Sequence, residues 1–245
     1  MRRMLYALVL LGAGVVAGDT RGDVVGSGAP EFRSIKALEY GGSRFVAYGD
    51  ARGVFHVIRK DSTGAVEEWE GGPLESAIGG VFCGDLDRDG ALEALAYSLT
   101  GSIMVFDLET RRRAWSNRPD EFDAITCLTV ANIDDDAQDE IIFCADLHLE
   151  VYDAKTQLRE WESIEEFEAQ DIEVGDVDED GQLEIVLNTG YVLDARFHDL
   201  EWQTEGFGER IALFDVDDDS IPEVIGEFSN GVIKVYDADL RREKW

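Results

Sequence analysis

Five tryptophans recur along this chain at nearly equal spacing, and no other feature restricts its fold as strongly. The gaps between them are 46, 46, 41 and 43 residues, and the positions are Trp69, Trp115, Trp161, Trp202 and Trp245. A short β-rich segment precedes each tryptophan. A period of about 40 to 45 residues is typical of architectures that copy one supersecondary unit. The sequence therefore predicts five copies of one module.

The third copy shows what the module contains. Residues 124–131 and 140–145 are apolar and β-branched, residues 147–152 alternate, and residues 158–161 form a fourth β-rich segment. Polar stretches separate them, as expected for loops between strands. Four short strands in about 45 residues make one propeller blade. We therefore predict an all-β β-propeller domain over residues 33–245 with about five four-stranded blades, at residues 34–72, 78–118, 124–163, 169–204 and 208–245.

The closure of the predicted ring is open at this point. Each module is contiguous, so no strand is lent from one end of the chain to the other. The fifth blade could pack its face on the first. The alternatives are an open arc, or a piece of a larger ring that another chain completes.

A nine-residue acidic loop follows the first strand of the second to fifth modules. Carboxylate or amide side chains stand at positions 1, 3, 5 and 9, namely Asp85, Asp87, Asp89 and Glu93; Asn132, Asp134, Asp136 and Glu140; Asp176, Asp178, Asp180 and Glu184; Asp215, Asp217, Asp219 and Glu223. Position 7 would add a backbone carbonyl from Ala91, Gln138, Gln182 and Ile221. Irregular shells of oxygen ligands suit Ca²⁺ better than Mg²⁺. We expect up to four calcium ions, one in the first hairpin of each of blades 2–5.

The loops differ in their expected affinity. Position 6 favours glycine because the chain turns there in the left-handed region. Gly90 and Gly181 meet this need, whereas Ala137 and Ser220 do not, so these two loops are expected to bind more weakly. An EF-hand is excluded, because it needs a bidentate Glu at position 12 and flanking helices.

Two of these segments, GDLDRDG at 84–90 and GDVDEDG at 175–181, resemble the FG-GAP/VCBS repeat family of integrin α-chain propellers and many bacterial exported proteins. Phe207-Gly208 followed by residues 215–223 matches one repeat from its Phe-Gly start. Residues 231–245 also resemble the quinoprotein-type propeller repeat. The resemblance covers residues 78–245, and the first module only poorly. It implies calcium in the first hairpin of each blade and partners on the opposite face. The chain departs from the family in having about five blades rather than seven and no first loop.

Charge and motifs narrow the function. With 53 acidic and 22 basic residues, the net charge of -31 disfavours nucleic acid and anionic membrane surfaces as partners. The chain carries no Gly-x-Ser-x-Gly elbow, Walker loop or zinc-type cluster. We expect a protein- or glycan-binding scaffold rather than an enzyme. The alternative is a carbohydrate-active enzyme of the glycan lyase kind, for which FG-GAP-like propellers are the family parallel.

Three phenylalanines stand at matching places just before a new blade, namely Phe122, Phe167 and Phe207. Acids or glycines flank each one, on the connections predicted to lie opposite the calcium loops. One interpretation is an aromatic and acidic rim that binds a basic or sugar partner. The alternative is that each ring packs between adjacent blades.

Residues 1–18 have the charged start, apolar run and small-residue end of a signal peptide, and an uncleaved anchor is the alternative. We expect a secreted, periplasmic or extracellular protein with a flexible leader at 19–32 and no other membrane span. The tripeptide Arg21-Gly22-Asp23 matches the integrin recognition sequence, as three residues often do by chance. If Ala131 pairs with Glu140, the register sets Cys127 opposite Cys144. A disulfide there, or small buried thiols, are the two alternatives.

Overall fold

The computed structural model describes residues 35–134 and 136–245, which form five antiparallel four-stranded sheets. This confirms the predicted all-β propeller architecture and its blade count. The predicted signal peptide, the leader and the Arg21-Gly22-Asp23 tripeptide lie outside the described residues. Within the described ranges, no helix has the length and apolar character needed to cross a membrane.

Within each blade the strands follow chain order. Blade 1 contains β1 (Ile35–Tyr40), β2 (Ser43–Gly49), β3 (Phe55–Lys60) and β4 (Val66–Gly71). Blade 2 contains β5 (Ile78–Gly84), β6 (Glu93–Ser98), β7 (Ile103–Asp107) and β8 (Arg112–Ser116). Blade 3 contains β9 (Ile125–Ala131), β10 (Glu140–Ala145), β11 (His148–Asp153) and β12 (Arg159–Glu162). Blade 4 contains β13 (Ile172–Gly175), β14 (Glu184–Leu187), β15 (Tyr191–Asp194) and β16 (Leu200–Gln203). Blade 5 contains β17 (Arg210–Phe214), β18 (Glu223–Glu227), β19 (Ile233–Asp237) and β20 (Arg242–Glu243).

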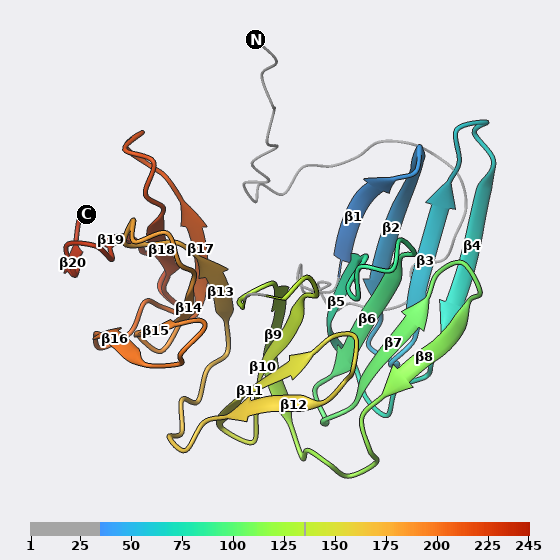
Figure 1. Cartoon of the computed structure of the whole chain (residues 1–245), viewed down its shortest axis with the longest axis horizontal. Coiled ribbons are helices and arrows are strands. Elements are labelled where there is room, and N and C mark those ends of the chain that lie inside the picture. The colour runs from blue at the N-terminus through green and yellow to red at the C-terminus, as the bar shows by residue number, and fades with distance from the viewer. Residues whose placement is uncertain (1–34, 135) are drawn as a thin grey trace.

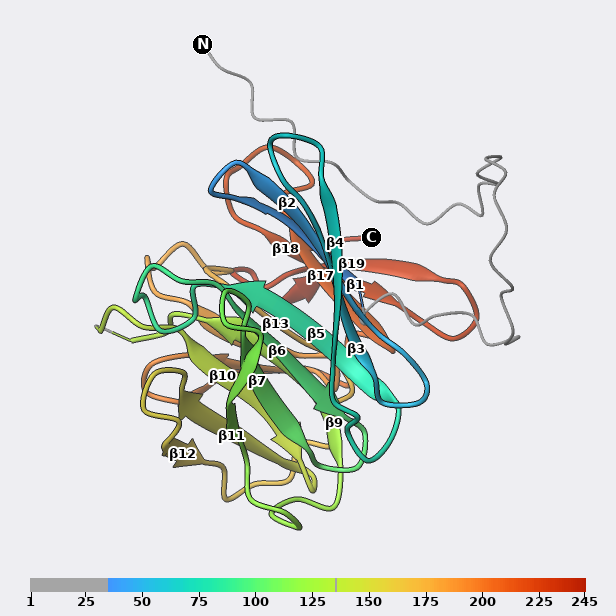
Figure 2. The ribbon, with the colours of Figure 1, turned by 90° about the vertical axis from the view of Figure 1, so that its right-hand side faces the viewer.

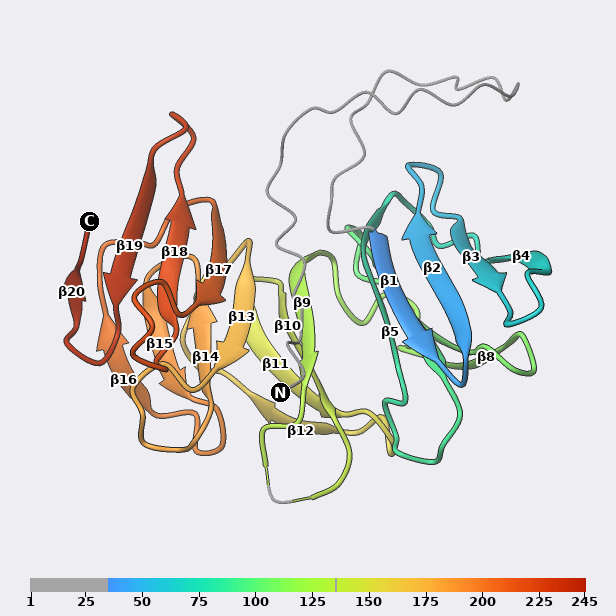
Figure 3. The same ribbon diagram turned by 90° about the horizontal axis from the view of Figure 1, so that it is seen from above.

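The blades stand side by side in a curved series (Figure 1). The first strands of successive blades contact one another, so β1, β5, β9, β13 and β17 line the inner edge of the curve. One apolar cluster joins each successive pair of blades. Figure 2 views the series from the side of blade 1. Among the described residues no apolar cluster joins blade 5 to blade 1, and these two blades lie at opposite ends of the series (Figure 3). The described blades therefore form an open arc.

The tryptophans occupy one equivalent place in all five blades. Four of them lie on the fourth strand directly opposite a valine of the third strand, in the pairs Val57–Trp69, Val105–Trp115, Val151–Trp161 and Val192–Trp202. In blade 5 the Val235 N–H donates to the carbonyl of Trp245 at 2.6 Å, which gives the fifth tryptophan the same neighbour. The repeat seen in the sequence is therefore the structural repeat.

The aromatic rim interpretation is wrong. Phe122, Phe167 and Phe207 are only 8%, 6% and 0% exposed, and each belongs to the apolar cluster between two successive blades. Leu74 has the equivalent place between blades 1 and 2. Each connection between blades thus inserts one apolar side chain into the interface that it crosses. Burying each phenyl ring away from water in this interface stabilises the packing of the two blades.

The register predicted for the third blade is correct. Ala131 pairs with Glu140, and Cys127 pairs with Cys144. Both of these cysteines are buried free thiols, and Cys83, in β5, is also free. Of the two alternatives for Cys127 and Cys144, the structure therefore has small buried thiols.

Candidate metal-binding loops

The four acidic loops share one hydrogen-bonding pattern. The side-chain oxygen of position 5 accepts the N–H of position 7 in every loop, at 2.7 to 2.9 Å. The glutamate at position 9 accepts the N–H of position 2 through Oε2 in every loop, at 2.7 to 2.9 Å. The four loops, although they differ in sequence, therefore share these two bonds. The left-handed turn at position 6 is present only in blades 2, 4 and 5, because Ala137 of blade 3 does not adopt it.

This fold brings acidic side chains together. In blades 2, 4 and 5 the residues at positions 1, 3 and 9 each offer a carboxylate oxygen within 4.8 Å of the other two. The three clusters are Asp85, Asp87 and Glu93; Asp176, Asp178 and Glu184; Asp215, Asp217 and Glu223. In blade 3 the cluster consists of positions 3, 5 and 9, namely Asp134, Asp136 and Glu140. Asp89 and Asp219, at position 5, lie outside the acidic clusters, although they accept the position 7 N–H as the other two do.

The position 9 glutamates are buried at the first residue of the second strand. Glu140 and Glu184 are 1% and 0% exposed, and in each the second carboxylate oxygen, Oε1, has no hydrogen-bond partner. Burial raises the pKa of Glu93 to about 7 and the pKa of Glu140 and of Glu184 to about 8, with the nearby aspartates adding to it. A buried carboxylate without a partner is costly. A cation against Oε1 would remove that cost.

Position 1 adds a second unpartnered oxygen in two loops. Oδ1 of Asp85 and Oδ1 of Asp176 are buried without a hydrogen-bond partner. These loops also turn through glycine at position 6, where Gly90 and Gly181 have φ of 93° and 85°. Ser220 adopts φ of 80° at the same position of the blade 5 loop, a strained conformation for a residue with a side chain. The loops of blades 2 and 4 therefore have the ligand set and the backbone that a metal site needs.

The blade 3 loop departs at position 1. The Asn132 side-chain amide donates to the backbone carbonyl of Gln138, the position 7 carbonyl predicted as a ligand, and to that of Asp136 at 3.2 Å. The amide group thus satisfies oxygens that a cation would otherwise bind. The following Asp139 is paired with Arg88 of the blade 2 loop, so neighbouring loops are tied to each other.

The blade 5 loop already contains a cation. Lys244 Nζ lies 2.6 Å from Asp217 Oδ2 and 2.7 Å from Glu223 Oε1, which is the oxygen left without a partner in blades 3 and 4. Hydrogen bonds to Asp217 and Glu223 raise the pKa of Lys244 above its usual range, and the same contact lowers the pKa of Asp217. The ammonium group therefore stands where a metal ion would contact positions 3 and 9.

The nine-residue loop motif does not include the residue that precedes each tryptophan, which also lies near the acidic clusters in blades 4 and 5. This position is Lys244 in blade 5, Glu201 in blade 4 and Glu160 in blade 3. Carboxylate oxygens of Glu201, Asp178 and Asp180 lie within 4.8 Å of one another in a further acidic cluster. Burial raises the pKa of Glu160 and of Glu201, with nearby loop aspartates as a further cause. The tryptophan repeat itself could have found them, because it places this residue equivalently in every blade.

A polar groove of about 820 Å³ lies between blades 4 and 5. Connections at the end opposite the acidic loops form much of it, including the linker around Gly206 and the β18–β19 turn at Ser229. Lys234, Arg241 and Arg242 also line it. Three acids, Glu205, Glu209 and Glu243, line the groove as well, Lys234 pairs with Glu243, and Arg242 lies 4.0 Å from Asp237, so the charges of the two signs balance in the groove.

Comparisons with known proteins place the fold but not the family. No family model and no curated protein matches the sequence. Among solved structures, the chain is similar to Saccharomyces cerevisiae Sqt1, with a TM-score of 0.63 and 15% identity over 82% of this chain. It is also similar to BBS1N, solved in complex with ARL6DN and soaked with lead, with a TM-score of 0.64 and 12% identity over 91% of this chain. The matches span 57% of Sqt1 and 69% of BBS1N, and both are β-propellers.

Proposed function

We propose that this protein is an exported propeller scaffold that calcium stabilises and that binds a protein or glycan partner. The observation that carries the calcium part is the buried, unpartnered Oε1 of Glu140 and of Glu184, two glutamates whose carboxylates each belong to a cluster with aspartates. We propose the FG-GAP/VCBS type of loop for these sites. Repetition in phase with the blades supports a common role.

We propose three calcium sites, in the loops of blades 2, 3 and 4, rather than the four expected from the motif. The sites of blades 2 and 4 are the stronger, because Asn132 costs the blade 3 loop one charge and occupies the Gln138 carbonyl. In blade 5, Lys244 takes the place of the ion. Calcium sites of extracellular modules bind at about 10⁻⁴–10⁻³ M, so export belongs to the proposal.

The binding part of the proposal rests on the fold and on the groove between blades 4 and 5. The β-propeller is a fold that presents connections on two faces, and the similar BBS1N structure is a complex with another protein. The groove includes connections at the end opposite the calcium loops, and Arg241, which forms no ion pair among the described residues, offers an acidic group of the partner a cation.

Isothermal titration calorimetry of the chelator-treated protein with CaCl₂ tests the calcium sites. We expect binding to approach three ions per chain, with MgCl₂ giving much weaker heats. Absence of a saturable calcium signal would contradict the proposal. Pull-downs from extracellular protein and glycan mixtures, with an Arg241→Glu/Arg242→Glu variant as the control, test the groove separately.

A further inference from the structure

The residue at position 2 of each calcium loop fills the space between its own blade and the next one. Leu86 of blade 2 belongs to the apolar cluster that contains Tyr152 and Ala154 of blade 3. Ile133 of blade 3 and Val177 of blade 4 likewise join the clusters formed with the following blade. These side chains are 4%, 8% and 0% exposed, respectively. Three of the four blade interfaces are therefore sealed at the loop end by a loop side chain.

The interface between blades 1 and 2 has no such side chain. β1 and β2 are joined by the turn Gly41-Gly42 in place of a nine-residue loop. At this end a pocket of about 320 Å³ lies between the two blades. One of its residues is Leu108, which follows the third strand of blade 2 as Ala154 follows that of blade 3. The pocket thus occupies the place that Leu86 fills one interface further along.

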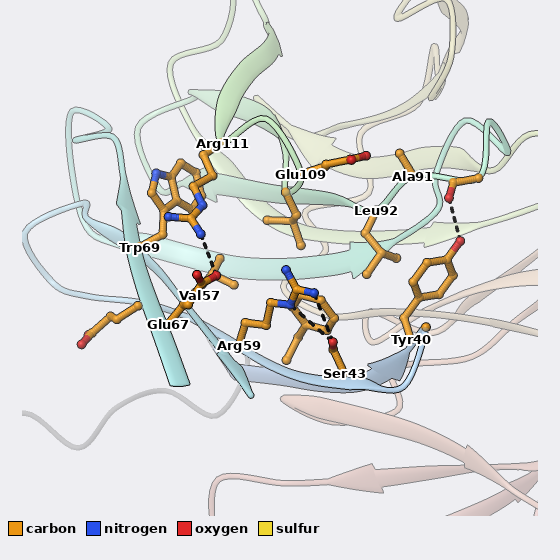
Figure 4. A pocket seen from close by; sticks show the side chains of 15 residues that line it. Tyr40, Ser43, Val57, Arg59, Glu67, Trp69, Ala91, Leu92, Glu109 and Arg111 are labelled. Carbon is orange, nitrogen blue, oxygen red and sulfur yellow. Dashed lines mark hydrogen bonds and ion pairs between the residues drawn. The ribbon is translucent and has the colours of Figure 1, made fainter. Parts of the chain in front are cut away.

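The wall of the pocket combines apolar side chains with two arginines and three glutamates. Blade 1 contributes Phe45, Val57 and Trp69, and blade 2 contributes Leu92 and Leu108. Figure 4 shows Trp69 at one end of the pocket and Tyr40 at the other, where the Tyr40 hydroxyl donates to the carbonyl of Gly90 at 2.8 Å. Its volume is at the lower end of the range of about 300–1,000 Å³ that is usual for ligand pockets. A large apolar side chain from a partner would restore the seal that the missing loop leaves out.

One cation of the pocket is available to a ligand. Arg59 lies between Trp69 and Tyr40 in the pocket (Figure 4). Its guanidinium donates long hydrogen bonds to Ser43 Oγ at 3.3 and 3.4 Å and lies over the Phe45 ring. Among the described residues, Arg59 forms no ion pair, although acids outnumber bases 53 to 22 in the chain. The second arginine of the pocket, Arg111, is neutralised by Glu67 at 2.7 Å.

The two features together select a ligand chemistry. We propose that this pocket binds the C-terminal residue of a partner protein, with its large apolar side chain between blades 1 and 2 and its α-carboxylate on Arg59. A terminal residue carries its side chain and its carboxylate on the same α-carbon, which suits one apolar space beside one guanidinium. Exposed Glu109 at the rim disfavours further acids in the partner segment. This site is separate from the groove between blades 4 and 5.

Fluorescence anisotropy of a labelled, otherwise uncharged pentapeptide ending in leucine tests the site at saturating calcium. The peptide with a free carboxylate should bind at least about tenfold more tightly than its C-terminal amide, since a charge-assisted hydrogen bond is lost in the amide. Arg59→Gln should abolish this difference. Arg44→Gln is the matched control, because Arg44 is an exposed arginine of the same blade whose ion pair is with Glu39.

A second variant tests the apolar part. Leu108→Trp should fill the pocket and reduce binding of the free-carboxylate peptide at least about tenfold, whereas a peptide ending in alanine should bind the wild type only weakly. Equal binding of the carboxylate and amide peptides, or no saturable binding below about 1 mM, would overturn the proposal. Melting with and without calcium on the same samples separates this failure from failure of the calcium sites.

Discussion

At the scale of single residues, the position 9 glutamate performs two separate tasks. Its Oε2 accepts the N–H of position 2 and so fixes the loop to the second strand, as Glu184 does for Val177 at 2.7 Å. Its Oε1 has no hydrogen-bond partner in Glu140 and Glu184, whose carboxylates lie in clusters with aspartates of the same loop. The first task needs only an acceptor, whereas the second needs a negative charge if the occupant is a cation. A substitution that keeps the acceptor and removes the charge separates the two.

Glu184→Gln is that substitution. With calcium present, loss of the ligand charge should remove about 1–2 kcal/mol of calcium-dependent stability, the amount that a site gains at about ten to thirty times its dissociation constant. With chelator present, the variant should be as stable as the wild type or more so, because an amide replaces a buried carboxyl group of which one oxygen, Oε1, has no partner. Thermal melting in both conditions measures this. A variant that loses the same stability in both would show a purely structural role.

Lys244→Ala tests the opposite situation. Its ammonium compensates Asp217 and Glu223, so the variant should be clearly destabilised in chelator, since the buried Glu223 loses its counter-charge. Calcium should then restore part of the stability, and calorimetry should find one more calcium ion per chain than in the wild type. Lys234→Ala, which removes an ion pair with Glu243 on the neighbouring strand, is the control. An unchanged number of ions would contradict the assignment of Lys244 to the metal position.

At the scale of elements, the turn between the second and third strands fits closely under the connection to the next blade. In blade 2 this turn contains Gly101, with φ of 87°, and a Cβ there would lie 1.9 Å from the Phe122 carbonyl oxygen. In blade 4, a Cβ added at Gly190 would likewise lie 2.5 Å from the Thr204 carbonyl oxygen. The connection that carries the buried phenylalanine therefore packs directly on the glycine turn. A change in the turn would displace the connection as well.

Gly101→Ala should therefore destabilise the protein by several kcal/mol, because the connection and Phe122 have to move out of the interface. Gly231→Ala is the matched control. Gly231 has a similar φ of 75° but nothing within 4 Å of the added Cβ, so it carries the backbone strain alone, about 1 kcal/mol. Chemical denaturation of both variants measures the difference. Equal losses would mean that the connection is not held by this contact.

The elements that sequence patterns predicted are those with a local signal. Strand alternation, the spacing of the tryptophans and the pairing of Ala131 with Glu140 all follow from the order of residues along one blade. The burial of Phe122 does not follow from it. A phenylalanine flanked by acids is compatible with an exposed position in the sequence, and only the packing of the neighbouring blade buries it. Lys244 was missed for a related reason: it lies 21 residues from Glu223 and reaches the loop only through the outermost strand.

At the scale of the whole molecule, the apolar packing between blades in the described ranges is between neighbours. The four apolar clusters and the Arg88–Asp139 pair all join successive blades. In such a linear arrangement, stability is the sum of terms for each unit and each interface. Calcium bound in one loop should therefore protect that blade and its neighbours rather than stiffen the whole chain uniformly. The distribution of the sites along the chain then determines where protection is found.

Hydrogen exchange read by mass spectrometry, with calcium and with chelator, checks this distribution. Protection on calcium addition should be largest in residues 85–93 and 176–184 and smaller in residues 132–140, where Asn132 already occupies a carbonyl. Residues 215–223 should change little because Lys244 is present in both conditions. Residues 35–71 should also change little, because the Gly41-Gly42 turn offers calcium no carboxylate.

Monovalent salt at equal ionic strength controls for screening of the net charge of -31. A calcium effect spread evenly over all five blades, or reproduced by salt, would show that the ion acts as a general counter-charge and that the loops are acidic turns without metal sites.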